Sequence, residues 1–113
     1  MKTTFFVDRC TWLRGSSNNS YLLDNNGNRC CLGFVCTQLS IKDYDMELEA
    51  EPFDSSNNTV LIPILLDENH NNNILSRRAM IINDDGTIND HVREVKLERL
   101  FEEYGLRINF FSS

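Results

Sequence analysis

Asn28-Arg29-Cys30-Cys31-Leu32-Gly33-Phe34-Val35-Cys36 places three of the four cysteines of this chain in one short, largely apolar run. Tyr21-Leu22-Leu23-Asp24 precedes it across Asn25-Asn26-Gly27, and Asn-Gly supplies the positive φ angles that a tight hairpin turn needs. The pattern therefore predicts a β-hairpin formed by residues 20–24 and 29–32. From residue 33 to residue 41 the apolar spacing fits a helical face better than strand alternation, so we expect a helix there.

The clustered cysteines have three possible uses: a buried core, a thiolate metal site or a redox site. Neighbouring residues of a strand point to opposite faces, so Cys30 and Cys31 are poorly placed to bind one zinc ion together. Further metal ligands would have to come from Cys10, Cys36, His70 or His91. A nucleophilic cysteine would need Arg29 for positive potential and a histidine as base. We interpret these cysteines as buried structural thiols, and we expect no cofactor.

The remaining segments predict a mixed fold. Residues 4–14 carry aromatic side chains at helical spacing and end at Gly15, which predicts a short amphipathic helix. Residues 42–58 are acidic and rich in turn formers, which indicates a loop. Residues 59–66 are apolar but contain Pro63, which a sheet tolerates at its edge. Residues 74–82 fit either a helix or a strand, and Asn83-Asp84-Asp85-Gly86 is typical of a turn.

The C-terminal elements have the strongest pattern. Asn89 or Asp90 can cap a helix whose apolar side chains recur at intervals of three and four residues up to Tyr104. Gly105 would end this helix, and residues 106–111 alternate like a strand. We therefore expect a single α+β domain over residues 1–113, with a small, mostly antiparallel sheet packed against two or three helices.

Composition narrows the classes of function. The net charge of −6 disfavours direct binding to nucleic acid, which requires a lysine- and arginine-rich surface. No stretch is long and apolar enough to suggest a membrane span, so we expect no membrane partner. The N-terminus begins like a signal peptide, but Asp8 and Arg9 interrupt its apolar core. These features favour a cytoplasmic protein with reduced cysteines.

Two groups of residues are candidate binding sites. Acidic side chains alternate at a period of two and would project one row of negative charge if the segment is extended. This row consists of Asp43, Asp45, Glu47, Glu49, Glu51 and Asp54. The alternative site is a pocket lined by Arg77, Arg78 and Arg107, which would hold a nucleotide at a homodimer interface with Trp12 or Tyr104 stacked on its base.

Several motifs resemble a family of small uncharacterised phage and prophage proteins, which carry a W-x-x-x-L-R-S-G helix and a Y-C-C-L-G-V-L-C hairpin. The matching segments here are Trp12-Leu13-Arg14-Gly15-Ser16 and Arg29-Cys30-Cys31-Leu32-Gly33-Phe34-Val35-Cys36. Ile82-Asn83-Asp84 and Leu100-Phe101 with Gly105-Leu106 resemble the family's later turn, helix and strand. Phe34 stands where the family has valine. The resemblance implies a phage accessory protein in the cytoplasm of a bacterial host.

Small size, the absence of a recognisable catalytic motif and this resemblance together favour a non-enzymatic protein. We expect an inhibitor of a host defence protein, such as an anti-CRISPR, that binds a nucleic-acid-binding enzyme through an acidic surface. The alternative is a sponge that sequesters a nucleotide immune signal in the arginine-lined pocket. A structural phage protein without a dedicated target is a third reading.

Overall fold

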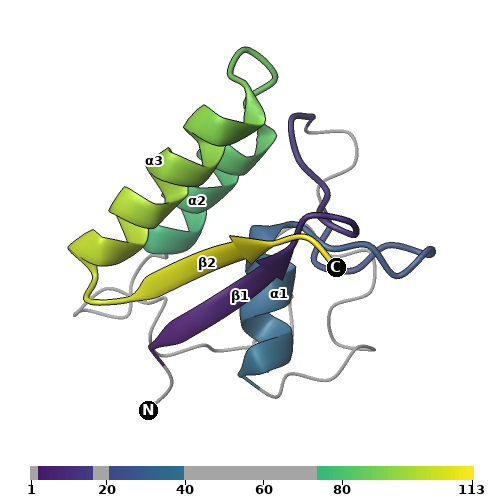
Figure 1. Ribbon diagram of the computed structural model, residues 1–113, viewed down its shortest axis with the longest axis horizontal. Coiled ribbons are helices and arrows are strands. Elements are labelled where there is room, and N and C mark those ends of the chain that lie inside the picture. The colour runs from purple at the N-terminus through teal and green to yellow at the C-terminus, as the bar shows by residue number, and fades with distance from the viewer. Residues whose placement is uncertain (1–2, 17–20, 40–73) are drawn as a thin grey trace.

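Two strands from opposite ends of the sequence form a parallel sheet. In this computed structural model, which describes residues 3–16, 21–39 and 74–113, β1 (Thr4–Asp8) pairs with β2 (Arg107–Phe111) (Figure 1). Thr4 lies opposite Arg107, and Asp8 lies opposite Phe111. The expected mostly antiparallel sheet is therefore wrong: the described residues form a two-stranded parallel sheet. Parallel neighbours need a long crossover connection, and here that connection contains all of the described helices.

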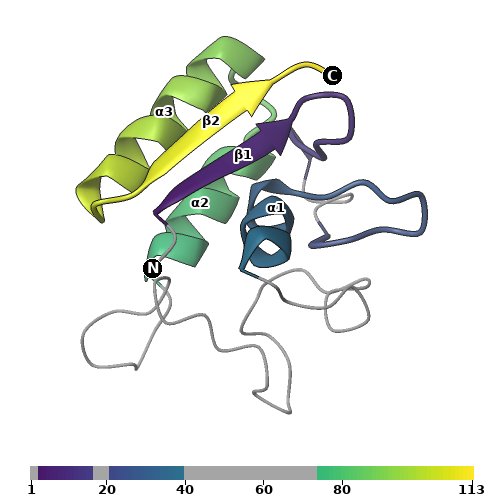
Figure 2. The ribbon, with the colours of Figure 1, turned by 60° about the horizontal axis from the view of Figure 1, so that its bottom comes forward.

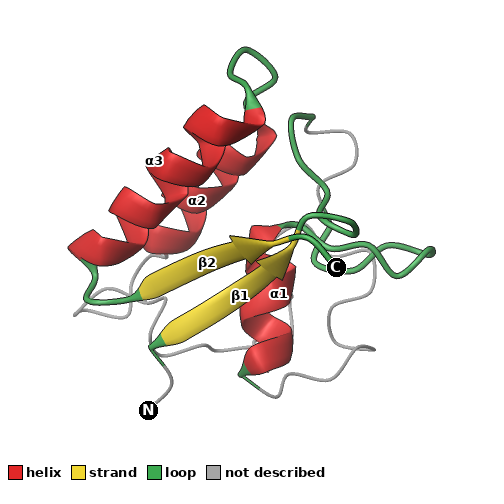
Figure 3. Cartoon of the chain, in the orientation of Figure 1, coloured by secondary structure: helices red, strands yellow, loops and turns green. Residues whose placement is uncertain are grey.

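Of the three helices that the structure describes, two pack on the sheet and the third packs on both of them. They are α1 (Cys31–Gln38), α2 (Ile74–Asp84) and α3 (Asp90–Glu103). α1 contacts β1 and α3 contacts β2, while α2 contacts both of the other helices (Figures 1 and 2). Figure 3 shows the described loop between α3 and β2 at one end of the sheet and the described loops that follow β1 and precede α1 at the other end. The number of described helices agrees with the expected two or three.

Alternation along both strands separates the core from the outer face of the sheet. Phe5 and Val7 of β1 and Ile108 of β2 are buried. Phe6 and Phe111 instead expose 45% and 43% of their surface. The buried side chains join those of the helices, including Leu32, Val35, Leu97, Leu100 and Phe101, in one apolar cluster.

The predicted helix over residues 4–14 is wrong, because this segment contains β1. The aromatic residues do occur at helical spacing, but Phe5 and Val7 also alternate with exposed neighbours, as a half-buried strand requires. Trp12 is buried beyond the end of the strand. Its backbone forms an isolated parallel bridge with Arg29 rather than a helical turn.

The predicted hairpin is only partly correct. The turn exists: Gly27 has a φ of 82°, and the Asp24 amide donates to the Asn28 carbonyl at 2.9 Å. However, α1 begins at Cys31, so residues 29–32 do not form the second strand of a hairpin. The predicted helix after Gly33 is confirmed, although it begins two residues earlier.

Gly33 allows α1 to approach the backbone of the preceding loop. A Cβ atom at this position would lie 2.0 Å from the carbonyl oxygen of Leu22. No side chain can be accommodated at that distance without moving the loop or the helix. The glycine of the Cys-Cys-Leu-Gly motif thus permits a close contact between two backbone segments.

The C-terminal predictions are confirmed. The side chain of Asn89 accepts a hydrogen bond from the Val92 amide and caps α3. Gly105 has a φ of 74°, a conformation that favours glycine, and it joins α3 to β2.

The segment 74–82 is part of a helix, α2, which continues into the predicted turn as far as Asp84. The expected loop at 42–58 and the expected strand at 59–66 lie outside the described residues.

The edge of β1 that faces away from β2 is covered by a side chain. Gln38, the last residue of α1, donates from Nε2 to the Phe6 carbonyl at 2.6 Å. Its Oε1 accepts from the Phe6 amide at 2.8 Å. One side-chain amide thus replaces the hydrogen bonds that a further strand would make.

Candidate functional site

Three of the four cysteines belong to the apolar core. Cys30, Cys31 and Cys36 are buried, and Cys10 is exposed. Burial raises the pKa of the Cys30 thiol to about 12 and also raises the pKa of Cys31 and Cys36. These thiols are protonated at neutral pH, and a protonated thiol is neither a nucleophile nor a good metal ligand. The interpretation of these three residues as buried thiols is confirmed.

Of the histidines proposed as partners for the cysteines, the structure describes only one. His91 is exposed in the first turn of α3, and His70 lies outside the described residues. Within the ranges 3–16, 21–39 and 74–113, no cluster of three or more histidine, cysteine, aspartate or glutamate side chains is arranged to hold a metal ion.

The three arginines of the alternative site lie in different surroundings. Arg78 forms a salt bridge with Glu103 at 2.6 Å. Arg77 borders a shallow pocket with Met80 and Ile81, whereas Arg107 lines a separate groove beside β2. The structure therefore does not bring these three guanidinium groups to one described pocket. Trp12, offered as a stacking residue, is buried and donates from Nε1 to the Asn83 side chain at 2.7 Å.

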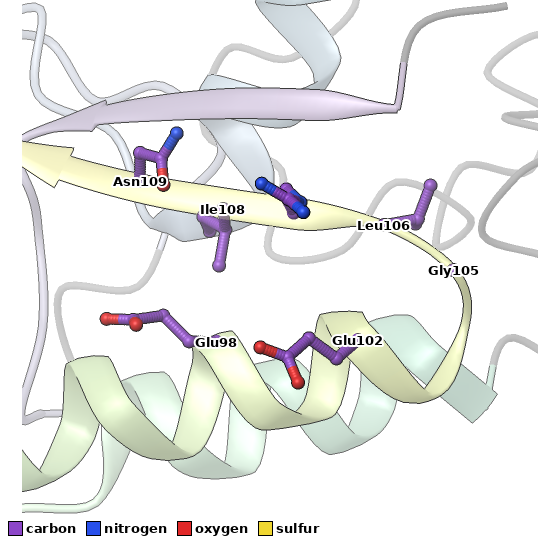
Figure 4. A pocket seen from close by; sticks show the side chains of 7 residues that line it. Glu98, Glu102, Gly105, Leu106, Ile108 and Asn109 are labelled. Carbon is purple, nitrogen blue, oxygen red and sulfur yellow. The ribbon is translucent and has the colours of Figure 1, made fainter.

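An open groove runs along β2 on the side opposite β1. Its volume is about 690 Å³, and the chain from Gly105 to Asn109 forms one wall. Glu98 and Glu102 of α3 form the other wall, and Figure 4 shows both side chains on the helix beside the strand. Ile108 is buried beneath the groove. We call this feature the β2 groove.

The acidic wall of the β2 groove belongs to a stripe of glutamates on α3. Glu94, Glu98 and Glu102 follow one another at intervals of four residues and so lie along one side of the helix. Glu94 is neutralised by Arg9, whose Nε and Nη2 donate to its two carboxylate oxygens at 2.7 and 2.8 Å. Among the described residues none forms an ion pair with Glu98 or Glu102, although the charge of Glu98 helps to raise the pKa of Arg9 and Arg107 lines the same groove.

The charges of α3 do not form a simple surface of alternating ion pairs. Glutamates and basic residues alternate along α3, a pattern typical of solvent-exposed ion pairs within a helix. Instead Arg93 is only 2% exposed. It forms a salt bridge with Asp90, and its Nη2 donates to the Asp85 carbonyl at 2.6 Å. Arg93 is thus removed from the surface, whereas Lys96 and Arg99 of the same helix stay exposed.

The sequence does contain a pattern that indicates this groove. Glutamates recur four residues apart in the same helix that carries the strongest apolar pattern, and a strand follows after Gly105. A helix and a strand joined by a tight turn must lie side by side. The expected acidic row of Asp43, Asp45, Glu47, Glu49, Glu51 and Asp54 lies outside the described residues and stays a prediction.

Comparison of the sequence with protein-family models and with curated proteins, and of the structure with solved structures, finds no significant match. Among the described helices, none has the length and apolar character needed to cross a membrane. The function must therefore be inferred from the residues of the β2 groove.

Proposed function

We propose that this protein is a non-enzymatic inhibitor with which a phage blocks a bacterial defence protein. In this proposal the β2 groove binds a basic surface of the target. The observation that carries the proposal is the pair Glu98 and Glu102, two carboxylates of like charge on one side of α3 with no described ion partner. Like charges four residues apart destabilise an isolated helix by a few tenths of a kcal/mol, and a cationic partner would remove that penalty.

The chemistry of the target follows from the charge of this protein. A net charge of −6 opposes contact with nucleic acid and favours contact with a protein that binds nucleic acid through basic residues. Occupying that basic surface would exclude the natural substrate by competition. The resemblance to phage and prophage proteins supports a bacterial defence enzyme as the target, as in an anti-CRISPR.

The state of the cysteines also supports binding rather than catalysis. A cysteine-dependent enzyme requires a thiolate that its substrate can reach. Cys30, Cys31 and Cys36 are buried, and burial raises the pKa of each thiol. The Cys-Cys-Leu-Gly segment thus serves the core, and the described feature most suited to a partner is the β2 groove.

Phage infection assays test this proposal. Bacteria that carry a nuclease-based defence system, such as CRISPR, would express the protein, and plating efficiency of a restricted phage would be measured. We expect the wild-type protein to restore plating and the double variant Glu98→Lys/Glu102→Lys to restore little. A charge-matched control is Asp67→Lys/Glu68→Lys, two acidic residues that belong neither to the acidic row nor to the described lining of the β2 groove, and we expect it to restore plating like the wild type.

The outcomes separate the function from the site. Failure of the wild-type protein to restore plating across a panel of such defence systems would refute the inhibitor function. Equal loss of inhibition in both double variants would refute the assignment of the β2 groove, because it would show that net charge alone matters. Circular dichroism of both purified variants checks that each remains folded.

A further inference from the structure

The outer edges of β1 and β2 have different neighbours in this fold. The outer edge of β1 is occupied by the side chain of Gln38, which binds both backbone groups of Phe6. The outer edge of β2 borders the β2 groove, and no strand pairs with it among the described residues. An unpaired edge presents amide and carbonyl groups that another extended chain can bind.

The register identifies which groups of β2 are exposed in this way. The Arg107 amide donates to the Thr3 carbonyl, and the Phe111 carbonyl accepts from the Arg9 amide. In a parallel ladder the amide and carbonyl of one residue face the same neighbour, and successive residues alternate between the two sides. The amides and carbonyls of Ile108 and Phe110 therefore face away from β1; Ile108 lines the β2 groove, and Phe110 continues the same edge beyond it.

We propose that the β2 groove binds an extended, basic segment of the partner protein, which adds to the sheet as a third strand beside β2. This proposal depends on the proposed function, since it names how the same groove engages its partner. The backbone of the segment would bind the amides and carbonyls of Ile108 and Phe110, as in other cases of strand addition.

Spacing indicates where the basic residues of the segment would lie. Glu98 and Glu102 are one helical turn apart, which corresponds to about 6 Å along α3. Alternate residues of a strand are about 7 Å apart and point to the same face. Lysine or arginine at alternate positions of the segment would therefore match the two carboxylates in turn.

The fold already contains one contact of the proposed kind. Arg9 follows β1 directly, and its guanidinium group binds Glu94, the first member of the same glutamate stripe, through two hydrogen bonds. The stripe thus accepts a cation delivered from the sheet layer. Glu98 and Glu102 continue the stripe beside the edge of β2, where Arg107 also lines the groove but no described residue forms an ion pair with either carboxylate.

The residues between the basic positions would lie on the opposite face of the extended sheet. On that face β2 presents Arg107, Asn109 and Phe111, of which Phe111 is 43% exposed. An apolar side chain beside Phe111 would cover part of this ring. The matching segment therefore alternates basic and apolar residues.

A short synthetic peptide that alternates lysine and valine is a direct probe. Nuclear magnetic resonance would follow amide exchange in the labelled full-length protein as the peptide is added. We expect the amides of Ile108 and Phe110 to exchange at least about tenfold more slowly when the peptide is bound. Slower exchange should not extend to the Phe6 amide, which Gln38 already protects.

Two controls separate strand addition from simple charge attraction. A peptide of the same sequence with methylated backbone amides keeps its charge but cannot form the ladder, so we expect it to leave both amides unprotected. In the protein, Glu98→Gln/Glu102→Gln should weaken binding of the lysine peptide by about three- to tenfold, as expected for two exposed ion pairs.

Other results would overturn the proposal. Equal binding of the methylated peptide would show that no strand is added. Protection of Ile108 and Phe110 by concentrating the protein alone would show that a second copy of this chain occupies the edge. If the protein inhibits a defence system but the peptide does not protect these amides, strand addition is refuted and the proposed function stands. If the peptide protects these amides but the protein inhibits no defence system, only the inhibitor function is refuted.

Discussion

Asn83 is a buried polar residue whose side chain forms hydrogen bonds with two other segments of the chain. It is fully buried, and its Oδ1 accepts hydrogen bonds from the Trp12 indole at 2.7 Å and from the Cys31 amide at 3.1 Å. Its Nδ2 donates to the Leu13 carbonyl at 2.9 Å. One side chain thus joins α2 to the segment after β1 and to the start of α1. This explains a polar residue in the core, because its hydrogen-bonding groups are satisfied there.

Substitution of this residue should be costly. Asn83→Ala leaves the Trp12 indole N–H and the Cys31 amide without their acceptor, so we expect the free energy of unfolding to fall by about 3 kcal/mol. Urea titration followed by tryptophan fluorescence measures the change. Asn26→Ala, in the exposed turn before α1, is the control and should change stability by less than about 0.5 kcal/mol. Equal effects of both substitutions would contradict the role assigned to Asn83.

Individual residues also show where sequence patterns mislead. Arg93 has acidic neighbours in sequence, a pattern typical of a solvated helix surface. In the structure its guanidinium group binds the carbonyls of Asp85 and Ile88, which lie in the loop between α2 and α3. Those acceptors are backbone atoms, and the residue types of a loop give no indication that its carbonyls will converge on one point.

At the scale of elements, the close approach of α1 to the loop before it depends on Gly33. Alanine is normally the better helix former by about 1 kcal/mol. Here the added Cβ would meet the Leu22 carbonyl oxygen at 2.0 Å, so Gly33→Ala should instead destabilise the protein by about 2 kcal/mol or more. Thermal unfolding measures the effect. Thr37→Ala on the exposed side of the same helix should be neutral or slightly stabilising, and a stabilised Gly33→Ala variant would show that the contact is not tight.

Gln38 provides a second test, at the edge of the sheet. Gln38→Ala removes both hydrogen bonds to Phe6, and because water can replace them we expect a loss of stability of only about 1 kcal/mol. Hydrogen exchange is the more sensitive measurement: the Phe6 amide should exchange faster in the variant. The Val7 amide, which faces β2, should be unaffected. Unchanged exchange at Phe6 would show that Gln38 does not protect this edge.

The elements differ in how far the sequence alone predicts them. α3 and β2 are predictable because the cap, the apolar spacing and the terminal glycine all lie within one continuous segment. β1 is not, because its partner lies about 100 residues away in the sequence and its short length fits two periodicities. The β2 groove lies between these cases: its two walls are both predictable, but its unpaired edge becomes visible only when β1 is known to occupy the other side.

At the scale of the whole molecule, the buried thiols should lower the free energy of unfolding at alkaline pH. Burial raises the pKa of Cys30, to about 12, and those of Cys31 and Cys36, whereas an unfolded thiol titrates near pH 8.5. Below about pH 8.5 both states keep these protons, and stability is fully present. As the pH rises from about 8.5 toward 12, only the unfolded state loses them, so the free energy of unfolding decreases.

Urea unfolding at pH 7.5 and pH 9.5 under reducing conditions measures this effect. Each buried thiol contributes up to about 1.4 kcal/mol per pH unit above its unfolded pKa. Cys36→Ala lowers stability at both pH values but should also reduce the difference between them. Cys10→Ala, at the exposed cysteine, is the matched control and should leave that difference unchanged. A pH dependence that persists fully in Cys36→Ala would argue against burial of its thiol.

The pairing of the first strand with the last has a consequence for synthesis of the protein on the ribosome. β1 is made before every other described element, but its partner in the sheet begins at Arg107. At about 5–20 residues per second, translation of the intervening chain takes roughly 5–20 s. Throughout that time Phe5 and Val7 lack the strand that pairs with them in the described sheet, so we expect chaperones to bind this apolar segment until β2 has left the ribosome. A premature stop codon before Arg107 would therefore abolish the sheet altogether, however much of the chain had been translated.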